Sequence, residues 1–148
     1  MIPVPRERQD AVSIFLHEIA RGLGINGFLD PETGTPREAD PRTKERYEPI
    51  VSTYDQHVEF DGRYFFFHGP AAMREYGNKP VPLTCPSILR PRGGQANNYH
   101  DLGDVEARDH HLYCDLMNGF EIRPGWRYHV SRLDLAILSD VGVPVLGL

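Results

Sequence analysis

The chain has 148 residues, the length of one domain with a single modest core. A hydrophobic fraction of 40% and a charged fraction of 25% are typical of a globular protein, and no stretch approaches the roughly 18 apolar residues of a membrane span. The net charge is −5 and the basic residues are scattered, which argues against nucleic acid or an anionic membrane as a partner.

The first clear element is a helix over residues 9–23. The preceding residues have neither a basic region nor an apolar run, so we expect no signal peptide. We expect Asp10 to cap the helix N-terminus and Gly24 to end the helix. Apolar side chains recur at helical spacing and form one face: Ala11, Val12, Phe15, Ile19, Ala20 and Leu23.

A polar stretch and a predicted hairpin follow. Residues 30–49 are rich in proline and charge, which predicts an exposed loop with a short helical turn near residues 44–47. Residues 51–67 contain two runs of Val, Tyr and Phe around Asp61-Gly62. That dipeptide suits the positive φ angles of a type I′ turn, so we expect a β-hairpin there.

The second half of the chain contains two predicted helices separated by a long loop. Residues 69–80 predict a short helix that begins near Pro70. Residues 80–112 have little periodicity and many Pro, Gly and Asn residues, which predicts loop. Residues 130–144 predict a last helix that Gly142 and Pro144 close.

The start of the last helix resembles a capping box. Ser131 is followed three residues later by Asp134, which takes the place of the usual Glu or Gln. With no repeat and no convincing linker, the elements together predict one α+β domain over residues 1–148. Cys85 and Cys114 are too few for a disulfide framework; they are either two thiols or one pair formed in an oxidising compartment.

The stretch FLHEIARGLG, residues 15–24, is close to a zinc-peptidase helix. In the pattern His-Glu-x-x-His, two histidines one turn apart bind Zn²⁺ and the glutamate polarises the metal-bound water. His17 and Glu18 match the first two positions, but Arg21 stands where the second histidine belongs. A His-Glu pair alone also fits a partly exposed histidine beside a solvated carboxylate, so other motifs must decide between the two interpretations.

Two later segments add to the motif. After the Gly-Leu-Gly ending of the helix come a long insertion, the segment DLMNG at residues 115–119, and SRLDLAILSDVG at residues 131–142. In this order the segments resemble the leishmanolysin-like metallopeptidases, which are metzincin-type zinc enzymes, over about residues 11–145. The resemblance implies peptide-bond hydrolysis by zinc-activated water, a peptide or protein substrate, and secretion.

The resemblance assigns roles residue by residue. His17 matches the first zinc ligand, Glu18 the general base, and Met117 the methionine of the turn beneath the metal. The distal third ligand has two candidate positions. His100 matches best, although it lies far before Met117; His110 and His111 lie closer and are the alternatives.

Arg21 puts catalysis in doubt. A guanidinium stays protonated and has no lone pair to give, so it cannot replace an imidazole ligand. Arg21 lies three residues after Glu18, where an ion pair on the helix face forms easily. Two hypotheses follow: a zinc metallopeptidase with weakened or lost zinc and impaired catalysis, or a non-catalytic binding or structural remnant of the family.

The region before the helix departs from the family pattern. In this family a twisted sheet precedes the zinc helix, and its edge strand aligns the substrate by β-augmentation. Only about ten residues precede the helix here, so the resemblance implies a domain that lacks this N-terminal half. The outer apolar face of the helix would then be uncovered, which predicts a homo-oligomer or a partner chain.

Overall fold

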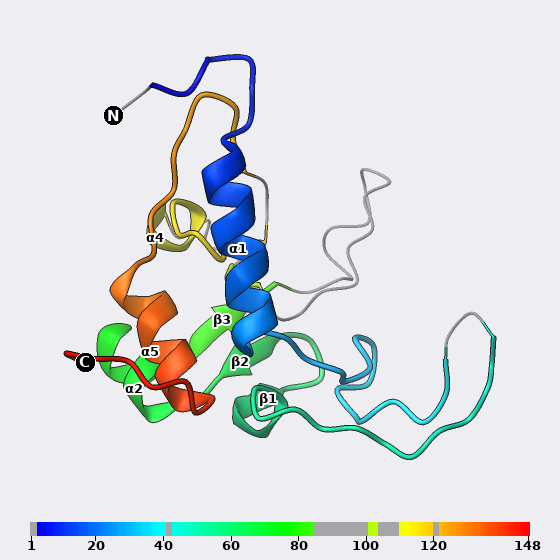
Figure 1. The fold of residues 1–148 in the computed structure, drawn as a ribbon. Coiled ribbons are helices and arrows are strands. Elements are labelled where there is room, and N and C mark those ends of the chain that lie inside the picture. The colour runs from blue at the N-terminus through cyan, green and yellow to red at the C-terminus, as the bar shows by residue number, and fades with distance from the viewer. Residues whose placement is uncertain (1–2, 41–42, 85–100, 104–109, 120–121) are drawn as a thin grey trace.

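The computed structural model describes residues 3–40, 43–84, 101–103, 110–119 and 122–148, and for residues 110 and 111 it describes only the backbone. It is an α+β protein in which helices pack around a small antiparallel sheet (Figure 1). In chain order the described elements are α1 (Ala11–Leu23), the 3₁₀ turn η1 (Asp55–His57), β1 (Val58–Phe60), β2 (Phe65–Phe67), α2 (Pro70–Glu75), β3 (Val81–Leu83), α4 (His110–Tyr113) and α5 (Arg132–Asp140).

The sheet has the order β1-β2-β3, with both neighbouring pairs antiparallel. Phe65 and Phe67 of the central strand are buried and the residue between them is only half-buried, as expected for a strand with one face on the core. The predicted hairpin is therefore confirmed over residues 58–67, whereas residues 55–57, expected in its first strand, form η1. Its turn differs from the prediction, because it spans residues 61–64 and the Asp61 carboxylate accepts hydrogen bonds from the N–H groups of residues 63 and 64.

Helix α1 begins and ends as its sequence predicts. The Asp10 carboxylate accepts hydrogen bonds from the Ser13 N–H at 3.2 Å and the Ser13 hydroxyl at 2.8 Å. Arg127 donates two further bonds to Asp10, at 2.9 and 2.8 Å, and this pairing holds the pKa of Asp10 well below its usual range. Gly24 ends the helix at a φ of 136°, which a side chain would strain.

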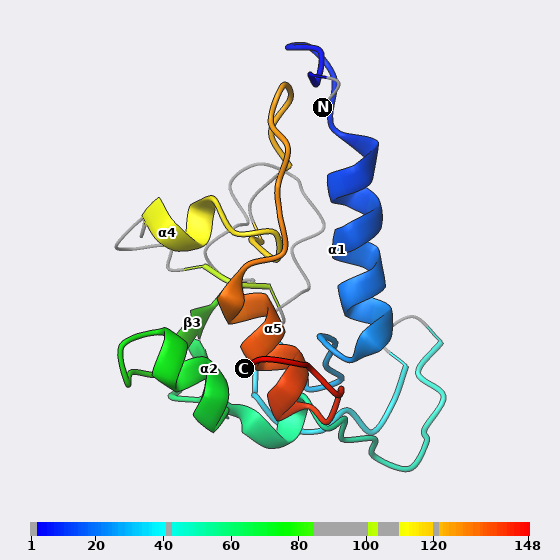
Figure 2. The same ribbon diagram turned by 60° about the vertical axis from the view of Figure 1, so that its left-hand side comes forward.

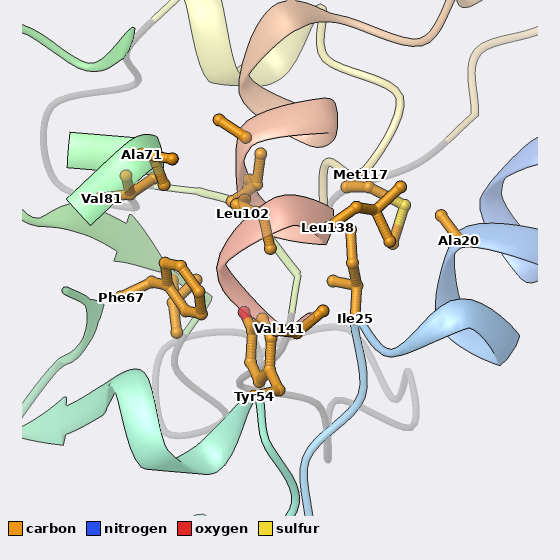
Figure 3. Close-up of a cluster of buried hydrophobic side chains, with 14 of the residues drawn as sticks. Ala20, Ile25, Tyr54, Phe67, Ala71, Val81, Leu102, Met117, Leu138 and Val141 are labelled. Atoms are coloured by element: carbon orange, nitrogen blue, oxygen red, sulfur yellow. The ribbon is translucent and has the colours of Figure 1, made fainter. Parts of the chain in front are cut away.

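The core forms where α2, α5, the sheet and the C-terminal half of α1 meet (Figures 1 and 2). Met117 is fully buried in this core, and Figure 3 shows its side chain between Ala20 of α1 and Leu138 of α5. The capping box of α5 is also confirmed, since the Ser131 side chain and the Asp134 side chain each accept a hydrogen bond from the backbone N–H of the other.

Helices α2 and α5 are joined end to end by one carboxylate. Gly69 has no side chain to cap α2, and Asp140, at the end of α5, accepts hydrogen bonds from the N–H groups of Ala71 at 2.9 Å and Ala72 at 2.8 Å. A side chain on Gly69 would collide with Asp140 and Phe67. The first turn of α2 is therefore capped by a residue about 70 positions away.

Two local predictions are wrong. The segment near residues 44–47 forms no helical turn: Ala39 pairs with Arg46 in an isolated antiparallel bridge, and Lys44 takes a φ of 61° in the bend. The stretch 80–112 is not all loop, since it contains β3 and the start of α4. The sequence of β3 does not alternate between apolar and polar residues. The strand forms because it can pair with the free edge of β2. Pro82 is tolerated there because a strand at the edge of a sheet does not need every backbone N–H as a donor.

The apolar stripe predicted along α1 faces mainly solvent. Phe15 is 68% exposed and Ile19 55%, while Ser13 and Ala20 are the buried residues of the helix. Figure 2 shows the reason: α1 stands at one edge of the molecule, and α5 lies beside its C-terminal half. Within the described residues, no helix combines the length and apolar character that a membrane span requires.

Candidate functional site

The His17 side chain lies on the inner side of α1 with both ring nitrogens in hydrogen bonds. Nδ1 lies 2.9 Å from the carbonyl oxygen of Leu116, and Nε2 lies 3.0 Å from Nε of Arg21. Arg21 can only donate, so Nε2 must accept, and the single proton of the neutral ring is on Nδ1 and is donated to Leu116. The arrangement specifies one tautomer and leaves His17 without a free lone pair.

Arg21 lies one turn after His17 on the same helix face and binds a carboxylate from a distant segment. Its guanidinium donates two hydrogen bonds to Asp101, at 2.7 and 2.8 Å, in the planar fork geometry typical of arginine. Both side chains are largely buried, with 17% of Arg21 and 9% of Asp101 exposed. Burial raises the pKa of the Asp101 carboxyl, and the neighbouring Arg21 charge opposes that increase.

The ion pair expected between Arg21 and Glu18 is replaced by this contact. Glu18 is exposed, whereas Asp101 offers a carboxylate on the buried side of α1. Asp101 is held in place by its own backbone, whose carbonyl accepts a hydrogen bond from Thr84 N at 2.8 Å. Asp101 is the part of the site that sequence patterns do not reveal; its one signal is that it directly follows His100.

The turn that contains Met117 lies against His17, as the Leu116 contact shows. Asp115 shapes this turn: its carboxylate accepts a hydrogen bond from Met117 N at 3.1 Å, and its carbonyl accepts one from the Asn118 amide at 2.8 Å. The backbone of Leu102 then bonds to both Met117 and Gly119. The structure thus brings together His17, Met117, Arg21 and Asp101 from segments about 100 residues apart.

The other predicted histidines add no observed ligand. His100 lies outside the described residues. His110 and His111 lie at the start of α4, and of these two residues only the backbone is described. Among the residues that are described, no group of three or more His, Cys, Asp or Glu side chains is arranged to hold a metal ion. Since Arg21 also uses the lone pair of His17, the described residues do not fit a zinc ion.

A hollow of about 350 Å³ opens beside this cluster. His17 and Glu18 line it from α1, and Asp101 and Gly119 line it from the opposite loops. Gln9 helps to close it by donating a hydrogen bond to the carbonyl of Ile122 at 2.9 Å. The volume lies at the lower end of the range for small-molecule pockets.

A second buried acid lies near the same turn. Asp134 is 1% exposed, and its Oδ1 atom has no hydrogen-bond partner among the described residues apart from the neighbouring carboxyl of Asp115. Burial, reinforced by the charge of Asp115, raises the pKa of Asp134 to about 9. Asp134 is therefore protonated at neutral pH and can donate that proton to Asp115.

The choice between two thiols and a Cys85–Cys114 pair lies outside the described residues. Cys114 follows α4 and is exposed, and Cys85 lies outside the described residues.

No protein-family model matches this sequence, and comparisons with curated proteins and with solved structures find no match either.

Proposed function

We propose that this chain is a leishmanolysin-like peptidase domain that no longer binds catalytic zinc and serves as a peptide-binding domain. One observation carries the proposal: Nε2 of His17, the atom that would bind zinc, accepts a hydrogen bond from Arg21 at 3.0 Å. The family assignment rests on the motif order around His17, Met117 and the last helix.

The electrostatics of the cluster support the loss of metal. The Arg21 guanidinium is permanently charged and is fixed by two bonds to Asp101. A dication about 5 Å from this charge would meet a repulsion of about 7 kcal/mol at an effective dielectric constant of 20. Zinc would also have to displace Arg21 from His17, which would break the two short bonds that the guanidinium donates to Asp101.

The hollow beside the cluster supports binding. Glu18, which matches the general base, is exposed on its wall, while the Asp101 carboxylate is already neutralised by Arg21. Among the described residues of the wall, Glu18 is thus the charged side chain with no observed ion-pair partner, which favours a peptide with a basic side chain. Without an activated water, Glu18 acts in this proposal as a recognition group.

The experiment combines metal analysis with a cleavage assay. Protein incubated with Zn²⁺ and dialysed is expected to contain far less than one zinc per chain and to cleave no member of a fluorogenic peptide library. Near-stoichiometric zinc with chelator-sensitive cleavage would establish the active peptidase instead.

A peptide-library selection tests the binding role. We expect the selected peptides to contain Lys or Arg and to lose at least about tenfold in affinity when Glu18 is changed to Gln, because a charge-assisted contact is removed. Glu38→Gln is the matched control, since Glu38 is an exposed acid that does not line the hollow. Binding that is equally strong in both variants would refute the assigned role of Glu18.

A further inference from the structure

The Arg21 guanidinium contacts three atoms that belong to two side chains. It donates to Nε2 of His17 and to both oxygens of Asp101, and Oδ1 of Asp101 lies 3.8 Å from Nε2 of His17. An imidazole nitrogen and a carboxylate oxygen thus converge on one positive charge. Nitrogen and oxygen donors of this kind are also the donors of zinc sites.

We infer that the guanidinium of Arg21 replaces a metal ion, and that Asp101 occupies the position of the third ligand. This inference rests on the proposed function, because it assumes that the helix descends from a zinc helix. It differs from the sequence-based expectation, which gave the third position to His100 or to the histidines of α4.

The far side of the His17 ring carries the first argument. A metal-bound histidine usually donates its second N–H to a carbonyl or carboxylate, and this bond sets the ring's tautomer and orientation. His17 donates Nδ1–H to the Leu116 carbonyl at 2.9 Å and directs Nε2 to Arg21. The ring therefore has the tautomer and the backbone hydrogen bond of a metal-bound histidine, and the Arg21 guanidinium lies at Nε2, where the metal ion would be.

The reach of Asp101 carries the second argument. Side chains four residues apart share a helix face, so a histidine at position 21 would lie beside His17. Asp101 already contacts the side chain at position 21 and is nearly within contact of His17. Since its carbonyl is bonded to Thr84, Asp101 needs no loop rearrangement to complete a site of two histidines and one carboxylate.

The test is zinc binding to the full chain carrying Arg21→His, measured by calorimetric titration and by the zinc-dependent shift of Tm. We expect one Zn²⁺ per chain, bound at least about 100-fold more tightly than by the unchanged protein, because a third protein ligand completes the site. Adding Asp101→Asn should lower that affinity at least about tenfold, since a charged ligand is lost. Adding His100→Ala should leave the affinity unchanged.

A second variant covers a folding failure. Arg21→His leaves Asp101 without its cation, and if this variant is unfolded in chelator we expect zinc to restore the far-UV circular dichroism of the unchanged protein. Arg21→His combined with Asp101→His removes the unpaired carboxylate, and we expect it to fold without metal and to bind Zn²⁺. A folded variant of either kind that binds Zn²⁺ no better than the unchanged protein would overturn the inference.

The two remaining outcomes separate the inference from the proposed function. Zinc affinity that survives Asp101→Asn but is lost on His100→Ala would overturn the place of Asp101 and leave the proposed function intact. Stoichiometric zinc in the unchanged protein would overturn both, because Arg21 would then not replace the metal.

Discussion

Two buried aspartates near the turn at residues 115–118 are neutralised in different ways. Asp101 is paired with the guanidinium of Arg21 through two short hydrogen bonds. Asp134 has no cation beside it in the part of the chain that the structure describes, faces another carboxyl, and has a pKa raised to about 9. One acid is thus neutralised by an arginine and the other by a proton.

The two ways of neutralising a buried aspartate make the stability of the fold depend on different things. A guanidinium keeps its charge at any ordinary pH, so the Arg21–Asp101 pair depends on one particular side chain. A proton is supplied by the solvent, so the Asp134–Asp115 pair depends on pH. Substitutions at the first pair and titration of the second should therefore produce the larger stability effects in this molecule.

Removing the cation from the first pair should have the largest effect. Arg21→Met keeps much of the side-chain volume but leaves Asp101 buried and unpaired, and we expect the free energy of unfolding to fall by about 3 kcal/mol. Urea unfolding at pH 7 measures this loss. The double substitution of Arg21→Met with Asp101→Leu should recover most of it, because no charge remains buried; equal losses in the single and double variants would show that packing, not charge, matters here.

Removing the proton-dependent acid should have the next largest effect, with the opposite sign. The folded protein keeps the Asp134 proton up to a pH of about 9, whereas the unfolded chain releases it near 3.8. The folded state therefore binds more protons between these values, and its stability falls as the pH rises, by up to about 1.4 kcal/mol per unit. Asp134→Asn, which is neutral throughout, should have a larger free energy of unfolding than the unchanged protein at pH 8, and the difference should grow as the pH rises.

Urea unfolding at pH 4, 6 and 8 measures this dependence. The two proteins should be close in stability at pH 4 and diverge as the pH rises. Parallel stability curves would mean that Asp134 is ionised in the folded protein.

The cap of α5 separates the helix start from charge burial at Asp134. Ser131→Ala removes the side-chain acceptor for Asp134 N, and we expect a loss of about 1 kcal/mol that does not change between pH 4 and pH 8. Ser139→Ala, in the last turn of the same helix, is the control and should change stability little. A strongly pH-dependent loss on Ser131→Ala would show that the cap and the acid are coupled.

An exposed ion pair gives the smallest expected effect and the reference for the buried one. Arg46 is 79% exposed and Glu38 61%, so their contact at 2.7 Å is screened by solvent. Glu38→Gln should change the free energy of unfolding by no more than about 0.5 kcal/mol, and added salt should reduce this difference further. If Glu38→Gln lowered the free energy of unfolding as much as Arg21→Met, burial would not explain why the Arg21–Asp101 pair matters more than the exposed pair.

Much of the local structure could be predicted from sequence, because its signals lie within a few residues. Asp10, Ser131 and Gly24 act at the helix ends where their side-chain and backbone chemistry places them. Strand β3 could not be predicted, since its pairing depends on an edge provided by another segment. The amphipathic pattern of α1 located the helix but not its surroundings, because a stripe of apolar residues does not say which face is covered.

The site was predicted only in part for the same reason. The helical spacing placed His17 and Arg21 on one face, and this is observed. The partner of Arg21 is 80 residues away, and no local pattern distinguishes Asp101 from the other acids of the chain. The packed fold decides which charged side chains meet over long distances in the sequence. Residue spacing alone could therefore predict only a local contact of Arg21, the one with Glu18.

The remote cap on α2 has a consequence for how the molecule opens. Since Asp140 accepts the N–H groups of Ala71 and Ala72, fraying at the end of α5 uncaps α2. The two helices should therefore open as one cooperative unit, with their amide protons exchanging at a common rate. Helix α1, which has its own cap in Asp10, should exchange independently of that unit.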